Sequence, residues 1–258
     1  MIIYKTQKEI EIMAQGGKIL AEVLDEVVGN ITPGVGTADL DAIAENLIIK
    51  RGGFPSFKNY RSMPGQKPFP TTLCTSINDE VVHAPAIPDR ILKQGDIIGL
   101  DIGMQLQGLF TDMAVTVGVG SISPQANKLL RVTKEVLDIA IDHFQENNYL
   151  SDIALAIQNY VRKNGFSVVR ELVGHGVGKE VHEEPNVPNF LTEESKLIPL
   201  KRGMTLAIEP MVNIGDWRIR LLDDNWTFAT ADGSLSAQFE HTIALDHNGD
   251  VRVLTAFD

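Results

Sequence analysis

The chain repeats one order of elements twice: two helices followed by strands. The first helix is indicated by Thr6 and Glu9, which have the spacing of a capping box, and by apolar residues every three or four positions up to Val27. Thr37 is the expected N-cap of the second helix. The strands expected in this half are residues 73–77, 97–104 and 113–117.

The second half begins with a strong helix signal, Ser123 followed by Pro124. Another helix is expected to start at Ser151. The strand signals of this half are residues 205–208 and 235–245, with a hairpin turn predicted at 232–233. This order favours two α+β halves packed sheet to sheet. Because no linker divides them, residues 1–258 are expected to form one domain.

Composition narrows the possible partners. The 258 residues include 23 Lys and Arg against 34 Asp and Glu, a net charge of −11, which argues against DNA or an anionic membrane as an obligatory partner. The one cysteine, Cys74, excludes an internal disulfide and a cysteine-rich zinc site. Charged residues come too early for a signal peptide, and no apolar run reaches the roughly 18 residues of a membrane span. We therefore expect a cytoplasmic protein and, without a coiled coil or apolar surface stripe, a monomer.

Four carboxylates interrupt segments that otherwise look like apolar strands. They are Asp101, Asp112, Glu209 and Glu240. An isolated carboxylate is costly to remove from water unless it is paired or bound to a cation. Any one of the four could belong to a capped turn or a structural ion pair. Few basic residues lie in the same segments, however, so the four together point to a cation site.

Three histidines could complete such a site. His175 lies within the run GHGVG, whose glycines allow close backbone approach and predict a tight bend. His182 follows seven residues later, and His83 follows a short apolar pair. Taken singly, each is better explained as a surface or core histidine than as a ligand. His241 adjoins Glu240, so in an extended strand it should point to the opposite face.

A set of carboxylates with one or two imidazoles suits hard or borderline divalent ions. The four carboxylates match the charge of two such ions, which favours a dinuclear site that activates water at neutral pH. Two divalent ions per chain are therefore expected. Aspartate, glutamate and histidine accept Co, Mn, Fe, Ni or Zn, so the ligands leave the choice among these metals open.

The motifs around these residues resemble those of the type I methionine aminopeptidases, which are M24 metallopeptidases, over essentially the whole chain. The shared motifs are SINDEVVH at 76–83, GDII at 95–98, GHGVG at 174–178, HEEP at 182–185, IEPM at 208–211 and SLSAQFEHT at 234–242. The resemblance implies an α+β pita-bread fold, in which two pseudo-symmetric α+β halves surround a central antiparallel sheet.

The resemblance also implies an activity: metal-dependent removal of the N-terminal methionine from nascent proteins and peptides whose second residue is small. By motif, Asp101 would hold one metal, His175 and Glu209 would hold the other, and Asp112 and Glu240 would bridge both. The free α-amine of the substrate would bind a metal. Association with the ribosome is a further implied possibility.

Two histidines and a glutamate would act on the substrate according to the same resemblance. His83 and His182 would lie beside the metals and contact substrate, with His182 donating to the scissile carbonyl. Glu209 would take a proton from the attacking water and return it to the leaving amine.

A methionine pocket is implied by local alignment at Tyr60, Phe69, Cys74 and Trp226, although ordinary core packing explains each of them as well. Cys74 is not expected to be a nucleophile, because no motif places a histidine to activate it. Val181 stands where the family usually has an aromatic residue, a departure that bears on the shape of the pocket.

A second departure is the length of the segment between Tyr60 and Phe69. The family usually has two residues there, whereas this chain has eight, residues 61–68. Two prolines and a glycine predict a surface loop. The loop either has no role in function or forms a rim of the pocket. In the second case Arg61 or Lys67 would contact the carboxylate end of a bound peptide.

Two alternatives remain open at this point. An Xaa-Pro aminopeptidase or prolidase-like enzyme would share the metal ligands, but it usually carries a large N-terminal domain, for which a first helix at about residue 6 leaves no room. A catalytically inactive pita-bread protein that binds peptides would be expected to lack ligands, whereas all five ligand positions are filled here.

Overall fold

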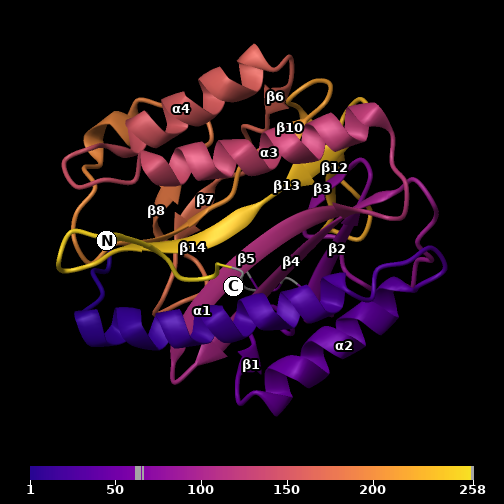
Figure 1. Cartoon of the computed structure of the whole chain (residues 1–258), viewed down its shortest axis with the longest axis horizontal. Helices are drawn as coiled ribbons and strands as arrows, with labels where there is room; N and C mark the ends of the chain where they lie inside the picture. Colours follow the sequence, from indigo (N-terminus) through magenta and orange to yellow (C-terminus); the bar gives the residue numbers. More distant parts are fainter. Residues whose placement is uncertain (62–64, 66, 257–258) are drawn as a thin grey trace.

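The computed structural model describes residues 1–61, 65 and 67–256. Within these residues four α-helices form two pairs, and each pair covers its own half of a central sheet (Figure 1). The helices are α1 (Gln7–Val28), α2 (Thr37–Lys50), α3 (Pro124–Asp142) and α4 (Leu150–Lys163), with a short 3₁₀ helix η1 (Glu194–Leu197). Helix α4 starts one residue before Ser151, the predicted start, because Asp152 accepts a hydrogen bond from the Tyr149 backbone N–H (2.7 Å).

Local caps start two of these helices as predicted. At α1 the Thr6 hydroxyl accepts from the Glu9 N–H (3.3 Å), and the Glu9 carboxylate accepts from the Thr6 N–H (2.8 Å), which completes the capping box. At α3 the Ser123 hydroxyl accepts from the Ala126 N–H (3.1 Å). Each of these caps joins residues within four positions of one another, so the local sequence is sufficient to predict it.

The predicted N-cap of α2 is wrong. Gly36 is the N-cap residue and Thr37 is the first helical residue. The Ala38 N–H donates to the Asp89 carboxylate (3.0 Å), while the Thr37 hydroxyl donates to the Ala86 carbonyl (2.7 Å). A side chain 51 residues away thus takes the place of a local cap, and no local sequence pattern predicts this contact.

The central sheet runs unbroken through both halves, and all its neighbouring strands are antiparallel. Within the described residues its strands are, in spatial order, β1 (Phe54–Pro55), β4 (Ile97–Leu106), β5 (Leu109–Gly118), β14 (Glu240–Leu245), β9 (Thr205–Ile208), β7 (Gly174–Gly176) and β8 (Glu183–Val187), with β2 (Leu73–Ile77) on β4 and β15 (Val251–Val253) on β14. Pairing of β5 with β14 joins the two halves edge to edge. The expected sheet-to-sheet packing of the halves is therefore wrong, whereas the two α+β halves around one antiparallel sheet are confirmed.

Two smaller sheets complete the described part of the chain. One contains β13 (Ser236–Gln238), β10 (Met211–Asn213) and β6 (Ser167–Val168), and the other β11 (Ile219–Leu221), β12 (Phe228–Thr230) and β3 (Glu80–Val82). The hairpin predicted at 232–233 is wrong, because β12 and β13 on either side of that turn belong to different sheets. The strand predicted at 235–245 is likewise divided at Phe239, which lets its two parts serve two sheets.

The hydrophobic core lies between helices and sheet. Helices α1 and α2 pack on β2, β4 and β5, and helices α3 and α4 pack on the strands of the second half. The helices thus cover one face of the central sheet, and the opposite face carries the candidate site. None of the helices in the described residues combines the length and apolar character needed to cross a membrane.

Candidate metal centre

The five predicted ligands come from neighbouring strands of the central sheet. Asp101 lies on β4, Asp112 on β5, Glu240 on β14 and His175 on β7, and Glu209 directly follows β9. These strands are adjacent in the sheet in the order β4, β5, β14, β9, β7. Sheet pairing therefore brings together ligands that are up to 139 positions apart in the sequence.

One cavity of about 830 Å³ collects all the predicted site residues. Its lining comprises the predicted residues Tyr60, Phe69, Cys74, His83, Asp101, Asp112, His175, His182, Glu209, Trp226 and Glu240, together with Phe57, Lys67, Leu221, Asp224, Asn225 and Phe228. Charged ligands occupy one wall and aromatic side chains the other, so the cavity is divided between a polar and an apolar part.

The donor set fits divalent metal. Ligand atoms of Asp112, His175 and Glu240 lie within 4.8 Å of one another, and His175 Nε2 is 3.7 Å from Glu209 Oε1. One buried carboxylate oxygen on each of Asp101, Asp112 and Glu240 has no hydrogen-bond partner among the described residues. Buried acceptors without donors are costly unless a cation satisfies them. Oxygen and imidazole donors of this kind suit a hard or borderline divalent ion.

Burial strongly shifts the pKa values of these groups. Burial raises the pKa of Asp101 to about 7. Burial first, and then the neighbouring carboxylates, raise the pKa of Asp112, Glu209 and Glu240 well above their usual range. Burial lowers the pKa of His175 to about 3, which keeps its imidazole neutral and free to ligate metal.

The glycines beside His175 permit close packing, as expected, but not through a tight bend. His175 lies within strand β7, and a register shift follows it in the pairing with β8. A Cβ at Gly174 would run into the Ala207 carbonyl, and one at Gly176 into the Glu184 carbonyl. The two glycines therefore let β9 and β8 approach the histidine from both sides, and the bulge supplies the local irregularity.

His182 lies at the mouth of the cavity, directly before β8. Its ring centroid is 4.3 Å from that of His175, and a 2.8 Å hydrogen bond joins its Nδ1 to the Tyr60 hydroxyl. His182 is exposed as a whole, but the protein around its ring displaces water and lowers the pKa of the imidazole below the usual value for histidine, so the ring is neutral near pH 7. Burial also raises the pKa of Tyr60, which keeps its hydroxyl protonated.

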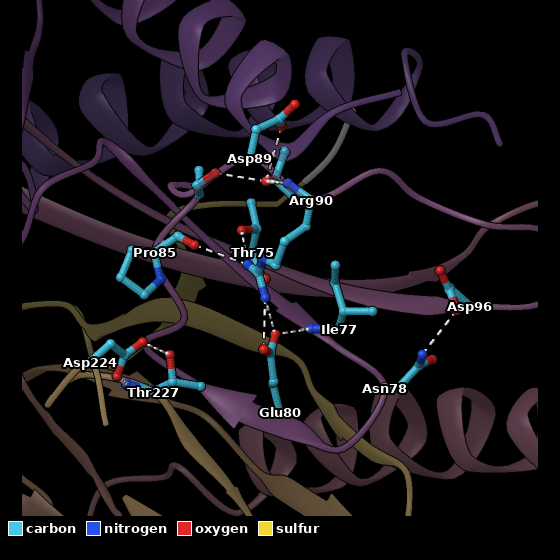
Figure 2. A network of polar contacts seen from close by, with 12 residues as sticks. Thr75, Ile77, Asn78, Glu80, Pro85, Asp89, Arg90, Asp96, Asp224 and Thr227 are labelled. Carbon is cyan, nitrogen blue, oxygen red and sulfur yellow. Dashed lines mark hydrogen bonds and ion pairs between the residues drawn. The ribbon is translucent and has the colours of Figure 1, made fainter. Parts of the chain in front are cut away.

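His83 reaches the cavity from a loop held by an arginine that the sequence did not single out. His83 has φ of 60°, a backbone conformation that is uncommon outside glycine. Nearby, the Arg90 guanidinium donates to both Glu80 carboxylate oxygens (2.7 and 2.5 Å), to the Thr75 carbonyl (2.6 Å) and to the Pro85 carbonyl (2.9 Å) (Figure 2). This network ties β2, β3 and the segment after His83 together. Burial lowers the pKa of His83 to about 4, so this imidazole is also neutral.

The apolar wall forms its own small cluster. Phe69 and Trp226 meet edge to face with ring centroids 5.1 Å apart, and Cys74 and Val181 are buried beside them. Val181 thus lies in the cluster where the family has an aromatic residue. Burial raises the pKa of the Cys74 thiol well above its usual value, in agreement with a packing rather than a nucleophilic role.

The stem of the 61–68 loop is closed by backbone hydrogen bonds. The Phe69 N–H donates to the Tyr60 carbonyl (2.8 Å), and the Asn59 N–H donates to the Phe69 carbonyl (2.8 Å). Residues 62–64 and 66 lie outside the described residues. Lys67 lines the cavity, and Arg61 is exposed.

Gln238 is a residue of the site that we did not single out, although it lies within the SLSAQFEHT motif. Its amide Nε2 donates to Glu209 Oε2 (3.1 Å), and it is 3% exposed. Two positions separate Gln238 from Glu240, a spacing that places side chains on one face of an extended segment. This alternation of side chains along the segment was the signal from which Gln238 could have been predicted. His241, as predicted, faces the other side of the sheet, where its Nδ1 is 3.0 Å from the Thr255 hydroxyl.

A curled antiparallel sheet with buried carboxylates and histidine on its open face defines a pita-bread metallopeptidase. The profile of Metallopeptidase family M24 matches residues 11–247. The chain belongs to the methionine aminopeptidases of this family.

Two comparisons carry this assignment, and a third shows the fold alone. The methionine aminopeptidase of Clostridium perfringens is 48% identical over 250 residues, which cover 96% of this chain and 97% of the relative. The crystal structure of the methionine aminopeptidase from Thermotoga maritima matches with a TM-score of 0.93 and 42% identity over 100% of both chains. The prolidase from Pyrococcus horikoshii shares the fold (TM-score 0.76, 21% identity), and the match covers 100% of this chain and 65% of that protein.

Proposed function

We propose that this chain is a metal-dependent aminopeptidase that removes the N-terminal methionine from peptides and nascent proteins whose second residue is small. The observation that carries the proposal is one cavity with two unlike walls. Buried carboxylates, three of which have an oxygen without a hydrogen-bond partner among the described residues, form one wall, and aromatic side chains with the Cys74 thiol form the other. A flexible, polarizable thioether suits the second wall.

Asp101, Asp112, His175, Glu209 and Glu240 would hold the metal, and we propose two divalent ions among them. When bound, these ions supply charge that lowers the pKa of water and polarises a carbonyl oxygen. Co, Mn, Fe, Ni and Zn all fit the donor types, and availability decides among them.

Glu209 is the proposed proton carrier. Its carboxylate lies 3.7 Å from His175 Nε2 and accepts a hydrogen bond from Gln238, which fixes its orientation. Glu209 takes the proton of the attacking water and returns it to the leaving amine.

His182 and His83 are proposed to contact the substrate as neutral imidazoles. If the protonated Tyr60 hydroxyl donates to Nδ1 of His182, the ring hydrogen resides on Nε2. That N–H is then available to the scissile carbonyl oxygen as negative charge develops on it. His83, held by the Arg90 network, approaches the cavity from the opposite half of the chain.

Peptide selectivity tests the proposal. Purified, metal-loaded protein should release methionine from Met-Ala-Ser and leave Ala-Pro peptides and Met-Leu-Ser essentially intact, with free amino acids quantified by chromatography. Protein treated with a chelator is the control and should be inactive until divalent metal is returned. Cleavage of Ala-Pro peptides with Met-Ala-Ser untouched would instead assign a proline-specific activity.

The same substrate class suggests where the protein acts. Nascent chains present their N-terminal methionine at the ribosome, so we propose a cytoplasmic enzyme that contacts ribosomes while working as a monomer. We also propose that residues 1–258 form one catalytic domain, since both halves contribute metal ligands. Co-sedimentation with ribosomes and light scattering of the free protein test these points.

A further inference from the structure

A fully buried ion pair lies behind the cavity, outside the proposed chemistry. The ammonium of Lys5 contacts the carboxylate of Glu183, and the two side chains are 1% and 2% exposed. The Lys5 ammonium also donates to the Ile3 carbonyl (3.0 Å). Removing both charges from water is costly, so such a pair is weak support for stability by itself. The position of this ion pair in the fold suggests a role other than stabilisation.

The N-terminal segment that carries Lys5 is fixed against the second half of the chain. The Lys5 backbone N–H donates to the Gly203 carbonyl (2.7 Å), and His247 Nε2 lies 2.9 Å from the Lys5 carbonyl. The Lys5 side chain then passes over Gly178, where an added Cβ would collide with its Cε. Gly178 has φ of +144°, so both its conformation and its missing side chain admit the lysine.

Glu183 ties together the turn that follows Gly178. One carboxylate oxygen receives Lys5, and the other accepts from the backbone N–H groups of Lys179 and Glu180 (3.1 Å for Glu180). Glu183 is also the first residue of β8 and the immediate neighbour of His182. The pair therefore anchors the chain at the residue next to the histidine.

The ring of His182 contacts the rings of His175 and Tyr60, with centroids 4.3 and 5.2 Å away, and its hydrogen-bond partner among the described residues is the Tyr60 hydroxyl (2.8 Å). His182 is otherwise exposed, and Tyr60 adjoins the 61–68 loop. The buried contacts of Glu183, the next residue along the chain, therefore anchor the backbone of His182. A small shift of a reacting group costs a large factor in rate.

We propose that Lys5 is a positioning residue for His182, acting through its buried contact with Glu183. The inference rests on the proposed role of His182 as a donor to the scissile carbonyl. Lys5 itself touches neither substrate nor metal ligand. Through this one side chain, the N-terminal segment helps to position a residue of the site, although the site itself is built mainly by strands distant in the sequence.

The test is a double-mutant cycle on steady-state kinetics. Lys5→Met should lower kcat for Met-Ala-Ser by about 10- to 100-fold while KM and metal content stay near the parent values. In the His182→Ala background the same change should lower kcat by less than about twofold, because the group it positions is absent. Arg252→Met, which removes an exposed partner of Glu11 on α1, is the matched control and should retain parent kinetics.

Circular dichroism and thermal melting establish folding of each variant. If Lys5→Met does not fold, the neutral pair Lys5→Met with Glu183→Gln replaces it, since no unpaired charge is then buried. Equal fold losses in the parent and His182→Ala backgrounds, or an unchanged kcat, would overturn the positioning role. Full activity of His182→Ala alone would instead remove the role of His182 on which the inference depends.

Discussion

The two walls of the cavity are built in different ways. The carboxylate wall lies on the central strands or directly beside them, and its members are almost fully buried, with Glu240 2% and Asp112 3% exposed. On the aromatic wall, Tyr60, Phe69 and Trp226 lie in connecting segments. Strand pairing fixes the first wall to the register of the sheet, whereas the second, apart from Cys74 on β2, depends on loops that tolerate insertion.

We therefore expect the carboxylate wall to determine the reaction class and the aromatic wall to determine the substrate preference. The buried carboxylates repel one another unless cations are bound among them, so single changes on the carboxylate wall should be severe. Changes on the loop-built wall should act mainly on substrate fit. The following predictions test that division.

Removing one carboxylate charge from the proposed metal centre should have the largest effect. Asp112→Asn or Glu240→Gln should reduce activity by several orders of magnitude, since each removes a charge from the proposed metal centre. Glu193→Gln, which changes an exposed carboxylate paired with Lys196, is the control and should keep parent activity. Full activity of either centre variant at saturating metal would remove the basis for the ligand assignment.

His182→Ala should lower kcat by about 10²- to 10³-fold, the usual cost of losing one donor to a developing oxyanion. Metal content, measured by elemental analysis, should equal that of the parent. A variant that loses one metal and regains its rate when metal is added would show that His182 is a ligand.

Metal-free protein should become less stable as pH rises above about 6.5. Asp101 has a folded-state pKa of about 7 against an ordinary value of 3.8, and the pKa values of Asp112, Glu209 and Glu240 are raised as well, so the folded state binds more of these carboxyl protons than the unfolded state. Between about pH 4 and 6.5 the lowered pKa values of four histidines oppose this effect, because their imidazoles are protonated only in the unfolded state; they are His83, His175, His182 and His241. Above about pH 6.5 the carboxylates dominate, so thermal melting with chelator should show the fall there, and divalent metal should reverse it. A midpoint that rises with pH above about 6.5 without metal would contradict the electrostatic argument.

Shortening the 61–68 loop to two residues should have the smallest effect. Long surface loops cost little closure entropy, so kcat/KM for a tripeptide should change by less than about threefold. A larger loss for a longer peptide than for the tripeptide would show that the rim, including Lys67, contacts the peptide beyond its first residues.

Local signals in the sequence predicted what is local in the structure. The capping box of α1, the Ser123 cap of α3 and the strands at 73–77 and 205–208 are all found where their patterns predicted them. The α2 cap and the 232–233 hairpin failed because Asp89 and a change of sheet decide them, and neither is visible in nearby residues.

For the candidate site, too, residues with a signal in their own segment were predicted, and residues defined by distant contacts were missed. Charged residues inside apolar strands and the family motifs pointed to all five proposed ligands. Arg90, Gln238 and Lys5 went unrecognised because their partners come from other elements. Lys5 in particular looks like an ordinary charged residue before a helix, and its burial follows from the packing of the 178–183 turn.

Metal binding tests the central claim most directly. Isothermal titration of metal-free protein with a divalent ion, for example Mn²⁺ or Co²⁺, should show two bound ions per chain. Glu240→Gln should lose one ion or bind at least about tenfold more weakly, and Glu193→Gln should match the parent. Identical stoichiometry and affinity in the parent and Glu240→Gln would contradict the assignment of the buried carboxylates as a metal centre.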